Sequence, residues 1–200
     1  MAGSRIVLEA ARRGHGVSGF SRSGGSSADL AGVAMFVADA TDPEAMRCIG
    51  TDHDVLVLAT RPTPGTEASV TLPVSTVLDA ALQTGRRVMV IGGAGPLQIP
   101  GGGGLVMDDQ RFVPKEWRAI AKASVDQFTA CGVHGADWTY LSPPALFGPG
   151  RRTGSYRRGG SELIVDAEGI SRISAEDLAI AAVDELENPH SGLRHFTVAY

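Results

Sequence analysis

The sequence is poor in the residues that mark several common classes of protein. Its two cysteines, Cys48 and Cys131, lie far apart and form no Cys-x-x-Cys pattern, which argues against a disulfide framework or a zinc site and favours a reducing compartment. No apolar run approaches the roughly 20 residues that a membrane-spanning helix needs, and the N-terminus has no apolar signal core. These absences predict a cytoplasmic protein without a membrane partner.

The sequence also has no large excess of positive or negative charge and few catalytic signatures. The net charge of -4 provides no broad basic surface, so no nucleic-acid partner is expected. Five histidines are present without metal-ligand spacing, so no metal site is predicted. Neither a Gly-x-Ser-x-Gly elbow nor a Gly-x-x-x-x-Gly-Lys-Ser/Thr loop occurs, which disfavours an α/β-hydrolase and a nucleoside triphosphate site.

The sequence does contain a regular alternation of apolar strands and helices. With 200 residues, 43% of them hydrophobic, one domain with a sizeable core is expected over residues 1–200. The alternation predicts the α/β class, with a doubly wound, Rossmann-like parallel sheet. The expected strands are 17–21, 33–38, 54–60, 87–91 and 136–141, and the expected helices are 1–14, 43–50, 66–84 and 115–131.

Local signals sharpen three of these elements. The continuously apolar strand 33–38 is expected to be buried on both faces of a parallel sheet. Asp42 or Thr41 is expected to cap the helix that begins at Pro43. Pro73 is expected to kink the helix 66–84 or delay its start, and Gly85 to end it.

Residues 142–200 are less regular and are expected to contribute a substrate-side cap to the same domain. Short strands are predicted at 163–165 and 170–173, and a strand at 195–198. Between them, Ser174 to Asp177 has the spacing of a capping box that opens a helix to about Leu186. Arg151, Arg152, Arg157 and Arg158 could recognise an anionic substrate or belong to a solvated loop.

Ligands of a doubly wound sheet bind at the carboxyl ends of its strands, which directs attention to the loops there. Arg22 follows the strand 17–21, where an arginine can pair with the 2′-phosphate of NADP; alternatively it is a solvated surface residue. Asp39 follows the next strand and would lie near the adenine or serve as a turn residue. The Gly92 to Gly95 turn could admit a flat nicotinamide ring or be an ordinary loop.

The order of motifs along nearly the whole chain resembles one family. The segments that carry the resemblance are 2–7, 11–15, Arg22, 39–43, 90–95, 137–144, 152–157 and 173–179. They are similar to the atypical short-chain dehydrogenase/reductases, the NAD(P)H-binding proteins similar to NmrA and to flavin/biliverdin reductase B. The resemblance implies NADP(H) as the preferred cofactor, with NAD(H) possible, and a small-molecule substrate. The cofactor-binding residues that it implies are Gly3, Arg22, Asp39, Thr60, Gly92, Gly93, Ala94, Pro143 and Pro144.

Two features depart from the family pattern. The family begins with a buried central strand and a Gly-x-x-Gly-x-x-Gly turn, of which only the last glycine, Gly3, is present here. We therefore expect the sheet to lack its first strand and Met1 to be an internal methionine, preceded naturally by about ten residues of strand and turn. The classical Tyr-x-x-x-Lys pair is also missing from the helix 115–131, so no catalytic residue is predicted.

Three functions remain open from the sequence. The first is an NADPH-dependent reductase that transfers hydride to a flat acceptor such as a flavin or quinone, which can take its proton from water. The second is a redox sensor that binds the dinucleotide without turnover. The third is a truncated product that cannot bind the cofactor. Neither the substrate nor the oligomeric state is predicted.

Overall fold

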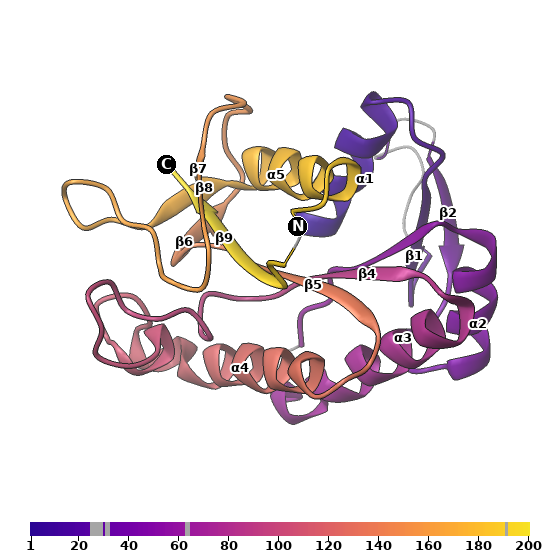
Figure 1. The fold of residues 1–200 in the computed structure, drawn as a ribbon, viewed down its shortest axis with the longest axis horizontal. Coiled ribbons are helices and arrows are strands. Elements are labelled where there is room, and N and C mark those ends of the chain that lie inside the picture. The colour runs from indigo at the N-terminus through magenta and orange to yellow at the C-terminus, as the bar shows by residue number, and fades with distance from the viewer. Residues whose placement is uncertain (25–29, 31–32, 63–64, 191) are drawn as a thin grey trace.

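The computed structural model describes residues 1–24, 30, 33–62, 65–190 and 192–200. Helices cover both faces of a mostly parallel sheet, with α2, α3 and α4 on one face and α1 and α5 on the other (Figure 1). The α-helices are α1 (Ala2–Arg12), α2 (Pro43–Asp52), α3 (Thr71–Thr84), α4 (Arg118–Gly132) and α5 (Ala175–Glu187). The 3-10 helices are η2 (Glu67–Val70), η3 (Val106–Asp108) and η4 (Lys115–Trp117).

Over the described residues, the strands form three separate sheets. They are β1 (Ser18–Ser21), β2 (Ala34–Val37), β3 (Val55–Leu58), β4 (Arg87–Ile91), β5 (Asp137–Ser142), β6 (Leu146–Gly148), β7 (Arg157–Gly159), β8 (Arg172–Ser174) and β9 (His195–Ala199). The main sheet has the order β3-β4-β5-β9-β7, parallel except for the β7–β9 pair. The parallel pairs β1–β2 and β6–β8 stand apart. The predicted α/β, Rossmann-like, doubly wound fold is confirmed.

The parallel sheet is divided beside β3. Within the described ranges, no strand pairing joins β1 or β2 to the five-stranded sheet. The β1–β2 pair lies on the same side of the molecule as α2 (Figure 1), and Phe20 of β1 meets the ring of His53 after α2, with centroids 5.7 Å apart. The division agrees with the expectation that the sheet lacks its first strand.

Capping and turn signals act as predicted. The Asp42 carboxylate accepts hydrogen bonds from the backbone N–H groups of Glu44 and Ala45 at the start of α2. The 3-10 helix η2 precedes α3, so Pro73 falls in the first turn of the α-helix, where its missing N–H costs nothing. The left-handed Gly85, with φ 68°, ends α3. At α5, the Ser174 hydroxyl accepts from the Asp177 N–H.

Two predictions about strands are wrong. The strand β2 is not buried on both faces, since Phe36 is 48% and Val37 73% exposed. The reason is that β2 belongs to a two-stranded sheet, in which both strands are edge strands, and is not an inner strand of the main sheet. Residues 163–165 form no strand; Leu163 is nevertheless buried, in a small core with Leu97 and Val106.

Each face of the main sheet has its own apolar core. Val74 and Leu78 of α3 pack against β3 and β4 on one side, and Leu178 of α5 packs with Phe196 of β9 on the other. In the described part of the chain, no helix has the length and apolar character needed to cross a membrane.

Candidate functional site

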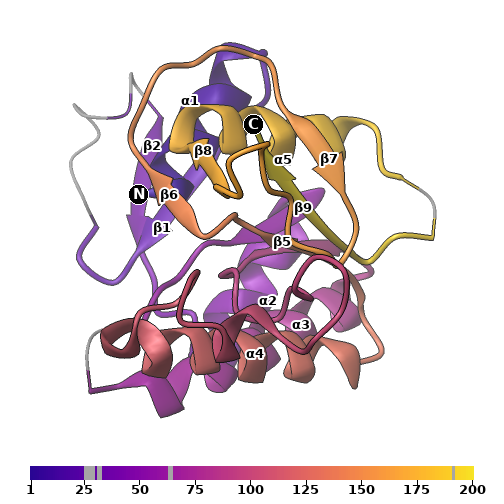
Figure 2. The same cartoon turned by 90° about the vertical axis from the view of Figure 1, so that its left-hand side faces the viewer.

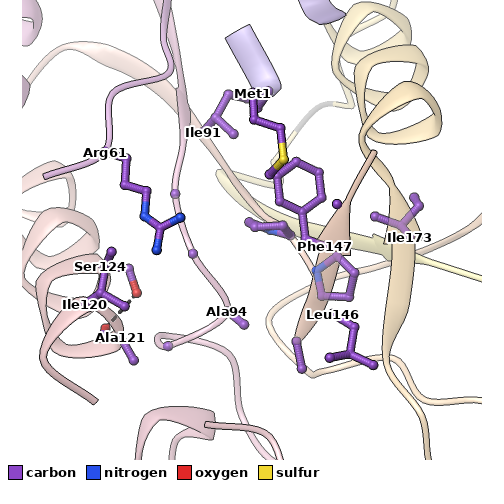
Figure 3. Close-up of a pocket in the computed structure, with 18 of the residues that line it drawn as sticks. Met1, Arg61, Ile91, Ala94, Ile120, Ala121, Ser124, Leu146, Phe147 and Ile173 are labelled. Carbon is purple, nitrogen blue, oxygen red and sulfur yellow. Dashed lines mark hydrogen bonds between the residues drawn. The ribbon is translucent and has the colours of Figure 1, made fainter. Parts of the chain in front are cut away.

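A cavity of about 1010 Å³ opens at the carboxyl ends of β3, β4 and β5. Parallel strands end at one edge of the sheet, so the loops after Leu58, Ile91 and Ser142 meet there. In Figure 3, α4 and Arg61 form one wall, and Leu146, Phe147 and Ile173 form the facing wall. Figure 2 shows β6, β8 and the C-terminus above β5, and α4 below it. The location is the one at which a doubly wound sheet binds its ligands.

The glycines after β4 allow very close packing under the cavity. A Cβ on Gly92 would lie 1.9 Å from Tyr140 Oη, and a Cβ on Gly95 would lie 2.3 Å from the Ala121 carbonyl oxygen of α4. Glycine is therefore required at both positions for steric reasons. The turn itself forms the floor of the cavity between its two walls.

Tyr140 lies below this turn and is part of the core. Its hydroxyl faces two acceptors at 2.9 Å, the Ser124 carbonyl and Gln127 Oε1, and it can donate its single proton to only one of them. Gln127 is 2% exposed, and its Nε2 has no partner within the described residues. Turning the amide would let Nε2 donate to Tyr140 Oη and satisfy both groups. Burial raises the pKa of Tyr140, so this phenol is a fully protonated structural group.

The structure brings most of the predicted cofactor residues to the cavity. Gly3 is not a lining residue but directly follows Ala2, which is one. A Cβ added to Gly3 would lie 3.3 Å from the Cβ of Ala59. Arg22 and Asp39 do not line the cavity. The predicted residues that do are Thr60, Gly92, Gly93, Ala94, Pro143 and Pro144.

Arg22 and Asp39 lie at the ends of β1 and β2, outside the cavity, and both are exposed. The Asp39 carboxylate accepts hydrogen bonds from the N–H and the hydroxyl of Thr41, each 2.9 Å long. These bonds, with a contribution from the positive charge of Arg22, lower the pKa of Asp39. Asp39 therefore forms a turn with Thr41, while its place near the adenine of a bound cofactor stays a prediction.

The N-terminus of α1 borders the cavity. Met1 and Ala2 are among its lining residues. The first turn of α1 has no acidic residue, and no side chain caps its N–H groups. Backbone N–H groups at a helix N-terminus, together with the helix dipole, favour an anion.

The described lining residues carry positive charge and no carboxylate. They include Arg61, Arg151 and Arg172, and none of them is Asp or Glu. Of the four arginines between positions 151 and 158, only Arg151 lines the cavity. Arg152 pairs with the buried Glu9, Arg158 pairs with Glu185, and Arg157 donates to the Val165 carbonyl. Arg61 and Arg172 were not predicted from the sequence. The position of Arg61, immediately after the expected carboxyl end of the strand 54–60, could have indicated it.

Asp177 at the start of α5 holds the loop that carries Arg151. Its carboxylate accepts hydrogen bonds from the Thr153 and Gly154 N–H groups and from the Tyr200 hydroxyl. Burial opposes ionisation of Asp177, but these bonds outweigh burial and lower its pKa. The loop that carries Arg151 is thus held against the start of α5 by hydrogen bonds.

The side chain of His195, at the start of β9, links two serines and does not line the cavity. Its Nε2 lies 2.9 Å from the Ser142 hydroxyl and its Nδ1 3.0 Å from that of Ser161. Burial lowers the pKa of His195 to about 4, so the ring is neutral near pH 7. Ser142 and His195 are both absent from the cavity lining, so this pair has a structural role.

Comparison with known proteins identifies the group to which the chain belongs. The uncharacterized protein YwnB of Bacillus subtilis is 35% identical over 202 residues, covering 98% of this chain and 92% of YwnB. A structure from Burkholderia pseudomallei, named "putative exported protein", is 39% identical with a TM-score of 0.87 and covers 100% and 95% of the two chains. The cytoplasmic location stays a prediction.

A third relative has a name that refers to chemistry. The structure of a "putative NADH-flavin reductase" of Streptococcus pneumoniae is 29% identical, with a TM-score of 0.85, over 99% of this chain and 93% of that one. Residues 1–189 match the sequence profile described as NAD(P)H-binding. The chain is therefore a member of the NAD(P)H-binding family, of the atypical short-chain dehydrogenase/reductase type.

Proposed function

We propose that the protein is an NADPH-dependent oxidoreductase that reduces a small, flat acceptor such as a flavin or a quinone. Membership of the NAD(P)H-binding family and the relative named for NADH-flavin reduction support this proposal. The cavity at the strand ends supports it as well, because its lining is largely apolar and contains the rings of Phe112, Trp117 and Phe147.

The residues present fit a nicotinamide dinucleotide. The uncapped N-terminus of α1 would hold the pyrophosphate, beside Gly3 and Thr60. Gly92, Gly93 and Ala94 would leave room for the nicotinamide, since all three line the cavity and none carries a side chain larger than a methyl group. When bound, the reduced nicotinamide supplies a hydride. Pro143 and Pro144 would frame the same region.

The observation that carries the proposal is the lack of an acidic or basic side chain suited to proton donation around the cavity. Among the described residues that line it, none is Lys, His, Cys, Asp or Glu. Thr60, the hydroxyl residue placed beside the pyrophosphate, lines it as well, and the hydroxyls of the other four, Ser124, Thr153, Ser174 and Tyr200, each donate to an acceptor of the protein. An acceptor that collects its proton from water therefore suits the site better than a carbonyl that needs an acid.

The decisive experiment measures NADPH oxidation by the purified protein with a panel of flavins and quinones. We expect turnover with at least one of them, and a rise in thermal stability on adding NADPH alone. If NADPH stabilises the protein but every acceptor stays unreduced, the redox-sensor function replaces the reductase. If NADPH does not bind, both functions fail for this chain.

Replacing Tyr140 by phenylalanine tests the lack of acid catalysis. We expect Tyr140→Phe to lower the free energy of unfolding by about 1 kcal/mol, because a buried hydrogen bond is lost. The kcat for acceptor reduction should change by less than about twofold, because Tyr140 is buried below the turn. A loss of about 100-fold in kcat by a folded variant would instead identify Tyr140 as a proton donor.

Replacing Arg22 by alanine tests the cofactor preference. We expect the unmutated protein to bind NADPH more tightly than NADH, and Arg22→Ala to lower the NADPH affinity about tenfold while leaving the NADH affinity unchanged. Arg47→Ala serves as the control, because Arg47 is also an exposed arginine but lies on α2. Equal affinity of the unmutated protein for both cofactors would refute the assignment of Arg22.

A further inference from the structure

Arg61 and Trp117 meet at the rim of the cavity, although 56 positions separate them in the sequence. The Arg61 guanidinium carbon lies 5.2 Å from the centroid of the Trp117 ring, and both residues line the cavity. Arg61 extends from the end of β3 toward α4, near Ile120 and Ser124 (Figure 3). Trp117 is 53% exposed, which is unusual for so large an apolar side chain. The pair presents a flat ring and a cation to the same space.

The guanidinium of Arg61 is otherwise unused. Among the described residues, no carboxylate pairs with Arg61 and no acceptor takes a hydrogen bond from it. Arg111 provides an internal comparison, because it also lies over an aromatic ring, that of Phe112, at 5.4 Å. Arg111, however, is bound through two nitrogens to the Asp109 carboxylate. Arg61 thus keeps its planar array of donors available for a ligand.

The surroundings of Arg61 favour an anionic ligand. No carboxylate is found among the lining residues that the structure describes, and Arg151 and Arg172 add positive charge. Charge of one sign in a cleft with apolar walls concentrates ligands of the opposite sign. The 2′-phosphate of the cofactor is assigned to Arg22 and the pyrophosphate to the N-terminus of α1. Arg61 is therefore available to bind a separate anion.

We propose that Arg61 and Trp117 determine acceptor specificity by selecting a flat molecule with an anionic substituent, a phosphate or a carboxylate. Trp117 supplies the platform for the ring, and Arg61 binds the anion with its planar donors. The identity of this molecule as a hydride acceptor rests on the proposed function. Its binding does not, and the two can therefore be tested separately.

Flavin mononucleotide and riboflavin are matched probes, because they share one ring system and differ by a phosphate. Quenching of flavin fluorescence, measured with saturating NADP⁺ so that no hydride is transferred, gives the two dissociation constants. We expect flavin mononucleotide to bind about tenfold more tightly than riboflavin in the unmutated protein. In Arg61→Ala this ratio should fall to about one, and Arg61→Lys should retain part of it.

Two further variants separate the roles of charge and ring. Arg111→Ala removes the same charge from an arginine that lies over a ring but outside the cavity lining, and it should leave the ratio unchanged. Trp117→Leu should weaken both flavins by a similar factor, because stacking does not depend on the phosphate.

The possible outcomes distinguish this inference from the proposed function. An Arg61-dependent preference without any NADPH oxidation would sustain the anion site and refute the reductase. Turnover with equal affinity for the two flavins would sustain the reductase and refute the anion site. The inference also fails if neither flavin binds, or if Arg61→Ala weakens NADP⁺ and leaves the flavin ratio intact.

Discussion

Replacing Gly95 by alanine is expected to lower the free energy of unfolding by about 3 kcal/mol. The added Cβ would lie 2.3 Å from the Ala121 carbonyl oxygen and 2.6 Å from Ser124 Oγ. The serine hydroxyl can rotate away, but the carbonyl belongs to the backbone of α4 and cannot. The turn after β4 must then move away from α4. Since this turn is the floor of the cavity, NADPH binding should be lost together with stability.

Unfolding in urea measures the effect on stability, and thermal shift with NADPH measures the effect on binding. Gly132→Ala is the matched control, because it adds the same atom at the end of α4, where nothing lies within 4 Å of it. It should leave stability unchanged or raise it by up to about 1 kcal/mol. A Gly95→Ala protein as stable as the control would show that the contact between the turn and α4 is not tight.

The stability of the protein should fall by about 3 kcal/mol between pH 6.5 and pH 4 because of His195. Its folded pKa of about 4 lies below the value of 6.5 for a free histidine. Between these values the unfolded chain binds a proton that the folded protein does not, so stability decreases as the pH falls. Above pH 6.5 the residue is neutral in both states and causes no loss.

Replacing His195 by glutamine isolates this effect. The amide cannot be protonated in this range and can still bond Ser142 and Ser161, so the difference in stability between pH 7 and pH 5 should be about 2 kcal/mol smaller in the variant. Acidic groups with lowered pKa values, such as Glu9 and Asp177, lose their contribution at lower pH and are present in both proteins. Parallel stability curves for the two proteins would contradict the role of His195.

Much of the fold could be predicted from local signals. Continuous apolar runs predicted β3 and β4, Asp42 and Pro43 predicted the start of α2, and Gly85 predicted the end of α3. Each of these signals acts between residues a few positions apart, whose relative placement hardly depends on the rest of the molecule. Three-residue strands such as β6 and β7 carry no such pattern and were missed.

The candidate site, too, has features that local sequence signals predict and features that they do not. The sequence by itself determined that Thr60, Gly92 and Pro143 lie at or just beyond the ends of strands, and parallel strand ends meet at one edge of a sheet. Only the tertiary structure decided that Gly92 must make room for Tyr140, and that Arg61 lies unpaired over Trp117 while Arg152 is neutralised by Glu9. These contacts join distant parts of the chain. They depend on how strands and helices pack in space, which no local pattern of residues specifies.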